Sequence, residues 1–240
     1  MTKTQFEDPE RQRLLQQYAE IATLAGGLAH EIKNPLSTIS MNLELLAEDL
    51  DGGDSARDRR MLTKIQSVQR ECQHLEDILD AFLQFARVGG LELSETSLNE
   101  VIEEFLAFYR PEAEEHNIEI SPHLGIDLAT VKLDRSLMRQ VLMNLALNAQ
   151  QAMPDGGLLE LQSFARDGRV CLEFIDNGCG MNERAQSNMF RVFFSTKPSG
   201  SGLGLPTVRK IIEAHNGTIT CESEVGRGTR FSISLPPSDG

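Results

Sequence analysis

Apolar residues recur at alternating spacings of four and three positions from residue 10 to about residue 50, and this pattern predicts one long amphipathic helix. One row of the apolar stripe contains Leu14, Ile21, Leu28 and Pro35, and the other contains Tyr18, Ala25, Ile32, Ile39 and Leu46. A proline inside a helix removes a hydrogen bond and bends the axis, so we expect a kink just after His30.

A second amphipathic stretch follows a turn at residues 51–55, whose sequence is Asp-Gly-Gly-Asp-Ser. Its core-facing positions are Leu62, Ile65, Cys72, Leu75, Leu79, Phe82 and Ala86. Two antiparallel helices cannot bury both apolar faces alone, so the pattern predicts a symmetric homodimer in which two hairpins form a four-helix bundle. A longer, monomeric coiled-coil hairpin is the alternative.

The periodicity changes after the Val-Gly-Gly sequence at residues 88–90. Helices are expected at 97–115, 134–152 and 203–215, and strands at 117–121, 129–133, 157–166, 169–175, 217–223 and 229–235. Turn sequences at 167–168 and 226–228 predict two hairpins near the end. The expected fold class is therefore α + α/β: a helical hairpin, then an α/β sandwich whose mixed sheet has helices on one face.

Length and charge restrict the possible classes of protein. The 240 residues suit two domains, which we place at residues 10–88 and 91–240. The formal net charge of −13 argues against a nucleic-acid partner, which requires a basic surface. A bound nucleotide would have to be held by backbone amides, a metal ion and a few cations.

The cysteines and the apolar runs indicate the cellular compartment. Cys72, Cys171, Cys179 and Cys221 form no C-x-x-C pair and no zinc pattern, so we expect reduced and mostly buried thiols. The first ten residues are polar and unlike a signal peptide, and no run approaches the ~18–20 apolar residues that span a bilayer. We expect a soluble, cytoplasmic protein without a membrane span.

His30 lies within the first helical pattern but off its apolar stripe, on the expected solvent side. Glu31 follows it directly, and Asn34 lies one helical turn further on the same face. Most exposed histidines on helices have no chemical role, so the position alone proves little. An exposed imidazole on a rigid helix can nevertheless act as a nucleophile or a proton acceptor.

The segment His-Glu-Ile-Lys-Asn-Pro-Leu at residues 30–36 resembles the H-box of the histidine protein kinases of two-component signalling, with no departure from the family pattern. The resemblance implies that His30 is the phosphoacceptor. It also implies that Glu31 orients the ring, and that Asn34 positions water in a phosphatase reaction on the partner. The alternative for Asn34 is that it caps a helix break at Pro35.

The next candidate segment is 140–152, where Asn144 and Asn148 share one helix face. Capped or surface asparagines are the alternative interpretation. The segment resembles the N-box of the ATPases shared by histidine kinases, type II topoisomerases and related chaperones. That likeness implies that Asn148 binds Mg²⁺ through its amide oxygen and that Asn144 lies beside the phosphates. Family members often have lysine where this chain has Gln151, so a direct cationic phosphate contact is missing there.

Two glycine-containing segments resemble further boxes of the same family. Residues 176–181, Asp-Asn-Gly-Cys-Gly-Met, follow a predicted strand and resemble the G1 box, although such a string is often a plain turn. The resemblance implies that Asp176 binds the adenine amino group and that Gly178 and Gly180 allow a tight turn and close approach of the base. Residues 200–205 precede a helix and resemble the G2 box, which implies that Gly202 and Gly204 approach the triphosphate.

Residues 190–197 resemble the F-box of the mobile lid over ATP, and Lys197 matches the lid lysine that would reach the γ-phosphate. Arg191-Val192 stands where the family commonly has Glu-Pro. The final segment, 226–231, resembles the last box, with Thr229 near the adenine-binding aspartate. These boxes are weak individually, but they occur in the family order from residue 28 to residue 231.

The resemblance implies an ATP- and Mg²⁺-dependent protein-histidine kinase that phosphorylates itself on His30 and passes the phosphoryl group to an aspartate of a response-regulator receiver domain. Only about ten residues precede the first helix, so we expect the signal to come from a separate sensory protein or from a missing portion. A degenerate ATP-binding scaffold or a phosphatase-only module is the alternative. A chaperone- or topoisomerase-type ATPase and a serine kinase on the same ATP fold are further alternatives, and neither needs the His30 segment.

Overall fold

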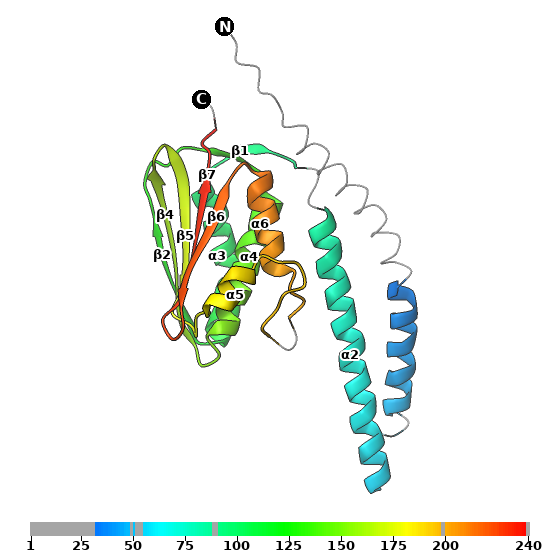
Figure 1. The fold of residues 1–240 in the computed structure, drawn as a ribbon. Helices are drawn as coiled ribbons and strands as arrows, with labels where there is room; N and C mark the ends of the chain where they lie inside the picture. Colours follow the sequence, from blue (N-terminus) through cyan, green and yellow to red (C-terminus); the bar gives the residue numbers. More distant parts are fainter. Residues whose placement is uncertain (1–31, 49, 51–54, 88–90, 198–199, 239–240) are drawn as a thin grey trace. The chain divides into compact units, whose positions relative to one another are not determined.

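The computed structural model of the chain describes residues 32–48, 50, 55–87, 91–197 and 200–238. The chain divides into two compact units, Met1–Gly89 and Gly90–Gly240. Among the described residues, the first unit contains two helices and the second combines strands with helices, so each is described by itself (Figure 1).

Two helices make up the described part of the first unit. The first runs through residues 32–48, and α2 covers Ala56–Arg87. Ser55 caps α2, because its Oγ accepts the backbone N–H of Asp58 at 3.1 Å. The first helix continues through Pro35, so Asn34 does not cap a helix break. The kink expected just after His30 begins outside the described residues.

Apolar side chains remain exposed along both helices of the hairpin. Leu36 and Cys72 are buried, whereas Leu75, one of the expected core positions, is 51% exposed. The exposed apolar residues include two rows with seven-residue spacing: Ile32, Ile39 and Leu46 on the first helix, and Met61, Val68 and Leu75 on α2. The hairpin therefore leaves much of its apolar stripe uncovered within a single chain.

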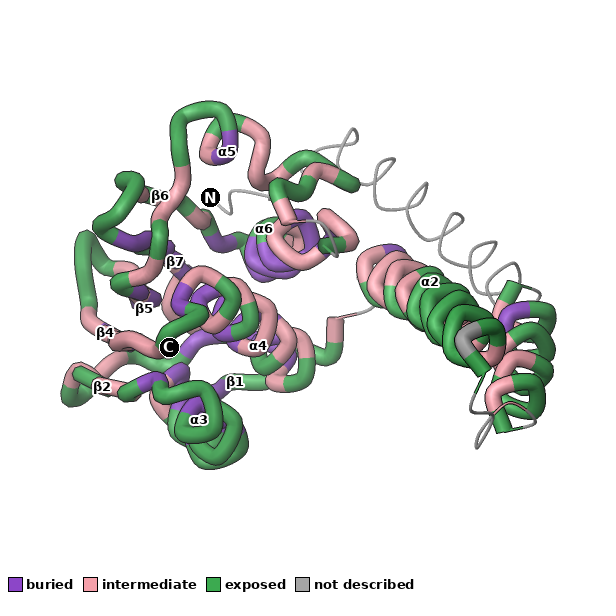
Figure 2. Tube along the Cα trace, turned by 90° about the horizontal axis from the view of Figure 1, so that it is seen from below, coloured by how far each residue is buried: buried purple, intermediate pink, exposed green. Residues whose placement is uncertain are grey.

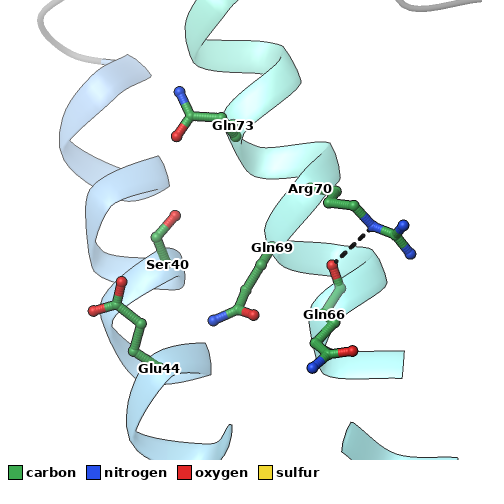
Figure 3. A pocket seen from close by; sticks show the side chains of 6 residues that line it. All are labelled: Ser40, Glu44, Gln66, Gln69, Arg70 and Gln73. Carbon is green, nitrogen blue, oxygen red and sulfur yellow. Dashed lines mark hydrogen bonds between the residues drawn. The ribbon is translucent and has the colours of Figure 1, made fainter. Parts of the chain in front are cut away.

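A groove of about 500 Å³ separates the two helices at one level of the hairpin. Figure 3 shows the side chains that line it, which are all polar: Ser40, Glu44, Gln66, Gln69, Arg70 and Gln73. Arg70 is held along α2, since its Nε donates to the carbonyl oxygen of Gln66 at 3.3 Å. At another level the helices are joined by an ion pair, in which Lys33 Nζ lies 2.6 Å from Asp80 Oδ1.

The second unit is built on a five-stranded mixed sheet with strand order β2-β4-β5-β7-β6. The strands are β2 (Ile118–Leu124), β4 (Gly157–Arg166), β5 (Arg169–Asp176), β6 (Thr218–Glu224) and β7 (Gly228–Leu235). β2 runs parallel to β4, and the remaining pairs are antiparallel. The β4–β5 and β6–β7 hairpins turn where the sequence predicts them.

Helices cover one face of this sheet, as the sequence predicts (Figure 1). They are α3 (Leu98–Glu115), α4 (Arg135–Ala152) and α6 (Gly204–Ala214), with the short α5 (Glu183–Asn188). Figure 2 shows buried residues where α4 and α6 approach the strands. Leu142 of α4, Ile211 of α6 and Leu172 of β5 are fully buried in this core. The expected α/β sandwich is confirmed.

Some elements differ from the expectation. The segment expected as one strand at 129–133 is shorter, and this β3 (Val131–Leu133) pairs with β1 (Ser94–Thr96) in a separate two-stranded sheet. β1 and α5 were not expected. β2 extends through Pro122 to Leu124, which an edge strand tolerates because one side of its backbone has no strand partner. Among the described helices, none has the length and apolarity needed to cross a bilayer.

Candidate active site

Helix α4 carries the two asparagines of the predicted site. Its start is fixed by Asp134, whose Oδ1 accepts the backbone N–H groups of Ser136 and Leu137 at 3.0 and 3.1 Å. Asn144 and Asn148 lie at the edge of the buried face of α4 and are both partly exposed. A side chain added at Gly204, the first residue of α6, would place its Cβ 3.7 Å from Asn144 Oδ1 and 4.0 Å from Asn148 Nδ2. The two amides and the start of α6 therefore line the same space.

Asp176 ends β5 and is 6% exposed. Its Oδ1 accepts the backbone N–H of Gly178 at 2.9 Å, and the backbone N–H of Thr229 also donates to the carboxylate. Burial raises the pKa of the Asp176 carboxyl, whereas both hydrogen bonds and the charge of Lys197 oppose that shift. A buried carboxylate at a strand end is suited to accept a hydrogen bond from an amino group of a ligand.

The glycine turn after Asp176 is clamped between two other elements. The N–H of Cys179 donates to the carbonyl oxygen of Ala152 at the end of α4 at 2.9 Å. A Cβ at Gly178 would lie 2.7 Å from that carbonyl oxygen, and one at Gly180, where φ is +65°, would overlap the carbonyl oxygen of Glu224. These two glycines are therefore required by the packing of the protein itself, in addition to any close approach by a base.

The loop from α5 to α6 contains the predicted lid, of which residues 189–197 and 200–203 are described. The N–H of Phe193 donates to the carbonyl oxygen of Gly202 at 3.0 Å. Gly202 has φ +67°, and a Cβ there would lie 2.5 Å from the carbonyl carbon of Phe193. Gly202 thus lets the lid pack directly on the loop before α6. The first-turn N–H groups of α6, at Gly204 and Leu205, have no intrahelical acceptors and can bind an anion. As expected, Pro206 lies in this first turn.

Lys197 of the lid contacts α4. Its Nζ donates to Gln151 Oε1 at 2.5 Å and to Asn148 Oδ1 at 3.3 Å. Burial lowers the pKa of Lys197, and the nearby Cys179 and Asp176 partly oppose that shift. The sequence has no lysine at position 151. Lys197, 46 positions further along the chain, instead places its ammonium group beside the Gln151 side chain.

Several residues of this site were missed by sequence reasoning. Ser223 Oγ accepts the N–H of Met181 at 2.8 Å and lies 3.0 Å from Thr229 Oγ1. Gln186 Nε2 donates to the carbonyl oxygens of Met181 and Ser223, at 2.9 and 2.7 Å. The thiol of Cys221 has its pKa raised to about 12 by burial and by the charges of Asp176 and Glu222. The alternation of β6 could have placed Cys221 and Ser223 on the inner face of the sheet.

The predicted site residues fall into two groups in space. Asn144, Asn148, Asp176, Lys197, Gly202, Gly204 and Thr229 come together in the second unit, with Gly178 and Gly180 in the adjoining turn. Asn34 belongs to the first unit, where it is exposed on the first helix. His30 and Glu31 lie outside the described residues.

The amide oxygen of Asn148 is a ligand of the kind that suits a Mg²⁺ ion also bound by phosphates. Asn148 Oδ1 already accepts a hydrogen bond from a cationic ammonium group, which shows that this oxygen faces a place suited to positive charge. No cluster of three acidic, histidine or cysteine side chains able to hold a metal occurs among the described residues. A Mg²⁺ ion with one or two protein ligands usually completes its shell with phosphate oxygens and water.

The cysteines differ in part from the expectation. All four are free thiols, as expected for reduced cysteines. Cys72 and Cys171 are buried, Cys221 is partly buried and Cys179 is exposed in the glycine turn.

The fold and this site define a helical hairpin followed by an ATPase-type domain, and comparison with known families agrees. Residues 133–239 match the family described as "Histidine kinase-, DNA gyrase B-, and HSP90-like ATPase". Residues 20–91 match the "His Kinase A (phospho-acceptor) domain". The catalytic domain of the histidine kinase ThkA is 31% identical, with a TM-score of 0.56 over 61% of this chain and 96% of that domain.

Longer relatives lead to the same family. The signal transduction histidine-protein kinase AtoS of Escherichia coli (strain K12) is 32% identical over 95% of this chain and 37% of the relative. Sporulation kinase D of Bacillus subtilis (strain 168) is 31% identical over 98% of this chain and 45% of its own length. A crystal structure of ThkA in complex with the response regulator protein TrrA matches with 26% identity and a TM-score of 0.68, over 99% of this chain and 68% of that chain. The chain belongs to the sensor histidine kinases of two-component systems, and it spans less than half the length of these two curated relatives.

Proposed function

We propose that this chain is a protein-histidine kinase that phosphorylates itself on His30 with ATP and transfers the phosphoryl group to an aspartate of a response-regulator receiver domain. One observation carries the proposal: amides of α4, the amino end of α6, the lid lysine and the buried Asp176 carboxylate converge in one domain. These groups suit the phosphates and the base of one nucleotide, and the H-box precedes them in the same chain.

Each part of the nucleotide has a candidate partner. Asp176 would accept a hydrogen bond from the adenine amino group, with Thr229 holding the carboxylate through its N–H. Gly202 and Gly204 would let the triphosphate approach the free amides of α6. Asn148 would hold Mg²⁺ through Oδ1, with Asn144 beside the phosphates, and the ion would neutralise phosphate charge. Lys197 would contact the γ-phosphate.

The reacting group would be a neutral ring nitrogen of His30. Its lone pair attacks the γ-phosphorus, so that an N–P bond forms while the bond to the bridging oxygen breaks and ADP leaves. Glu31 accepts a hydrogen bond from the other ring nitrogen, which stabilises the positive charge that develops on the ring. A receiver aspartate oxygen then attacks the phosphorus and His30 regains its neutral form.

A second activity rests on Asn34. Its side chain is exposed on a helix that continues through Pro35, and it lies four positions after His30 in the sequence. The amide could position a water molecule against the phosphoaspartate of the receiver domain, which would make the protein a phosphatase as well. The scaffold and phosphatase-only hypotheses differ from the kinase hypothesis in requiring no transfer to His30.

The assembly belongs to the same proposal. Residues 10–88 would dimerise through the uncovered apolar rows of the hairpin, and residues 91–240 would form the catalytic ATP-binding domain. We place the protein in the cytoplasm, with its input supplied by a separate sensory protein or by sequence beyond this chain. The response-regulator receiver domain would be its partner.

The test is incubation of the purified chain with γ-labelled ATP and Mg²⁺, beside the variants His30→Gln and Asn148→Ala. We expect acid-labile, base-stable label on the parent and on neither variant. A matched control is Asn42→Ala on the exposed face of the first helix, which should be labelled like the parent. Nucleotide binding without label on the parent would overturn the kinase hypothesis and favour the scaffold or the phosphatase.

A further inference from the structure

Gln151 is a neutral side chain that holds a cation. It is exposed at the end of α4, and its Oε1 accepts a hydrogen bond from Lys197 Nζ at 2.5 Å. The second acceptor of the same ammonium group, Asn148 Oδ1, is further away at 3.3 Å. Gln151 is therefore the nearer anchor of the lid lysine on α4, and Asn148 is the weaker one.

The lid backbone around Lys197 is fixed by its own turn. The N–H of Lys197 donates to Ser195 Oγ at 3.0 Å, and the N–H of Gly200 donates to the carbonyl oxygen of Lys197 at 3.2 Å. With the backbone held in this way, the side-chain contact to Gln151 determines where the ammonium group lies. A lysine without such a contact would sample many rotamers.

The chemistry of the acceptor matters as much as its position. The side-chain hydrogen bonds of Lys197 to Gln151 and Asn148 go to amide oxygens, so they orient the ammonium group without neutralising it. A carboxylate at position 151 would cancel the charge, and a second ammonium would repel it. An amide is the side chain that fixes the cation and leaves its charge available for an anion.

We propose that Gln151 is a positioning residue that seats Lys197 on the α4 face, so that the lid supplies the phosphate-binding cation of this site. This inference rests on the proposed function, because it takes a nucleotide polyphosphate as the anion. Since Asn148 makes only the longer contact, its Oδ1 can turn to Mg²⁺ while Lys197 stays on Gln151. The lid and the metal ligand would then act on the phosphates together.

The experiment is a charge series at the two positions, in the full chain. The variants are Gln151→Glu, Gln151→Lys, Lys197→Gln and the double variant that combines Gln151→Lys with Lys197→Gln, which exchanges the two side chains. The readout is the Kd of a fluorescent ATP analogue with and without Mg²⁺. The control Gln69→Glu makes the same charge change on α2, in the other unit.

Each single variant should weaken nucleotide binding by about tenfold. Gln151→Glu would neutralise the charge of Lys197, Gln151→Lys would repel Lys197, and Lys197→Gln would remove the cation. The exchange restores one cation and one amide, because the lysine introduced on α4 can donate to the glutamine introduced in the lid. It should recover binding to within about threefold of the parent. Recovery by exchange distinguishes positioning from a merely structural role, because two harmful changes would otherwise add.

A second readout follows the lid directly. Chymotryptic cleavage after Phe193 and Phe194 should be faster in Gln151→Lys than in the parent without nucleotide, and slower in Gln151→Glu, where the lid is held more tightly. An exchange variant that binds no better than either single variant, or a Gln151→Glu that binds like the parent, would overturn the inference alone. A parent that binds no nucleotide would overturn the proposed function as well.

Discussion

Burial shifts the pKa values of two charged side chains of the site in opposite directions. Burial raises the pKa of Asp176 and lowers the pKa of Lys197, so both groups lie where their charged forms are less well solvated than in water. Such sites gain from a ligand that satisfies both charges at once. An adenine amino group at one end and a phosphate at the other would do this.

The first residue-scale prediction concerns Asp176. Asp176→Asn removes the negative charge and leaves one amide oxygen as the only side-chain acceptor for the N–H groups of Gly178 and Thr229. We expect the Kd of a fluorescent ATP analogue to rise about tenfold or more, since a hydrogen bond to a charged group contributes ~1.5–3 kcal/mol. Asp155→Asn, at an exposed loop position, is the control and should bind like the parent. Equal binding by both variants would contradict the role given to Asp176.

A second prediction concerns thiol reactivity. The thiolate is the reactive form, and the pKa of Cys221 is raised to about 12, so only ~0.01% of this thiol is ionised at pH 8. Iodoacetamide at pH 8 should therefore modify the exposed Cys179 well before Cys221, as measured by peptide mass mapping. The rate at Cys221 should rise about tenfold per pH unit up to pH 10 while the fold holds. Equal rates at the two cysteines at pH 8 would contradict this account.

At the scale of elements, the long strands and helices were predictable because their patterns are local. The alternation in 157–166 and 169–175 predicted β4 and β5 almost to the residue. β1 was missed because Ser-Glu-Thr has no apolar signal, and α5 because six largely polar residues show no helical stripe. Only the structure shows that β3 leaves the main sheet to pair with β1.

The site was predictable as a set of segments but not as a set of contacts. Resemblance to the family boxes identified Asn148 and Lys197 separately. The contact between Asn148 and Lys197, and the role of Gln151 in it, depend on how the lid folds over α4. Local sequence patterns do not show this folding. The absence of lysine at position 151 was interpreted as a missing cation because the sequence does not show what fills that place.

The third prediction concerns His215, which joins two helices. Its Nδ1–H donates to the carbonyl oxygen of Ile211 in α6 at 2.7 Å, and its Nε2 accepts the N–H of Asp134, the N-cap of α4, at 2.9 Å. Asp134 Oδ2 also accepts the N–H of Glu92 at 3.1 Å. His215 is 3% exposed, so this contact ties the ends of α4 and α6 that lie away from the nucleotide site.

We expect His215→Ala to lower the free energy of unfolding of the second unit by ~2–4 kcal/mol, because it leaves a cavity and a buried N–H without an acceptor. Denaturant unfolding followed by circular dichroism measures this. His123→Ala, on the exposed edge strand β2, is the matched control and should change stability by less than ~0.5 kcal/mol. Similar losses in both variants would show that His215 does not join the helices in solution.

At the scale of the whole molecule, the net charge and the exposed apolar surface have opposite effects on self-association. A net charge of −13 disfavours self-association through general repulsion. The hairpin nevertheless exposes two seven-spaced apolar rows, whose members Ile39 and Leu75 are 45% and 51% exposed. A dimer is stable only if burial of these rows exceeds the repulsion, so association should be weaker at low salt and stronger when charges are screened.

The last prediction follows from that balance. A carboxylate placed in either row would have to be desolvated on association, so Ile39→Asp and Leu75→Asp should each convert a dimer into a monomer in sedimentation experiments. Ile126→Asp adds the same charge at an 87% exposed apolar residue of the second unit and should leave the dimer intact. Because the residues proposed to bind the nucleotide all lie in the second unit, nucleotide affinity should be unchanged in all three variants. A monomeric parent would contradict the proposed homodimer, and row variants that remain dimeric would place the association elsewhere than on these rows.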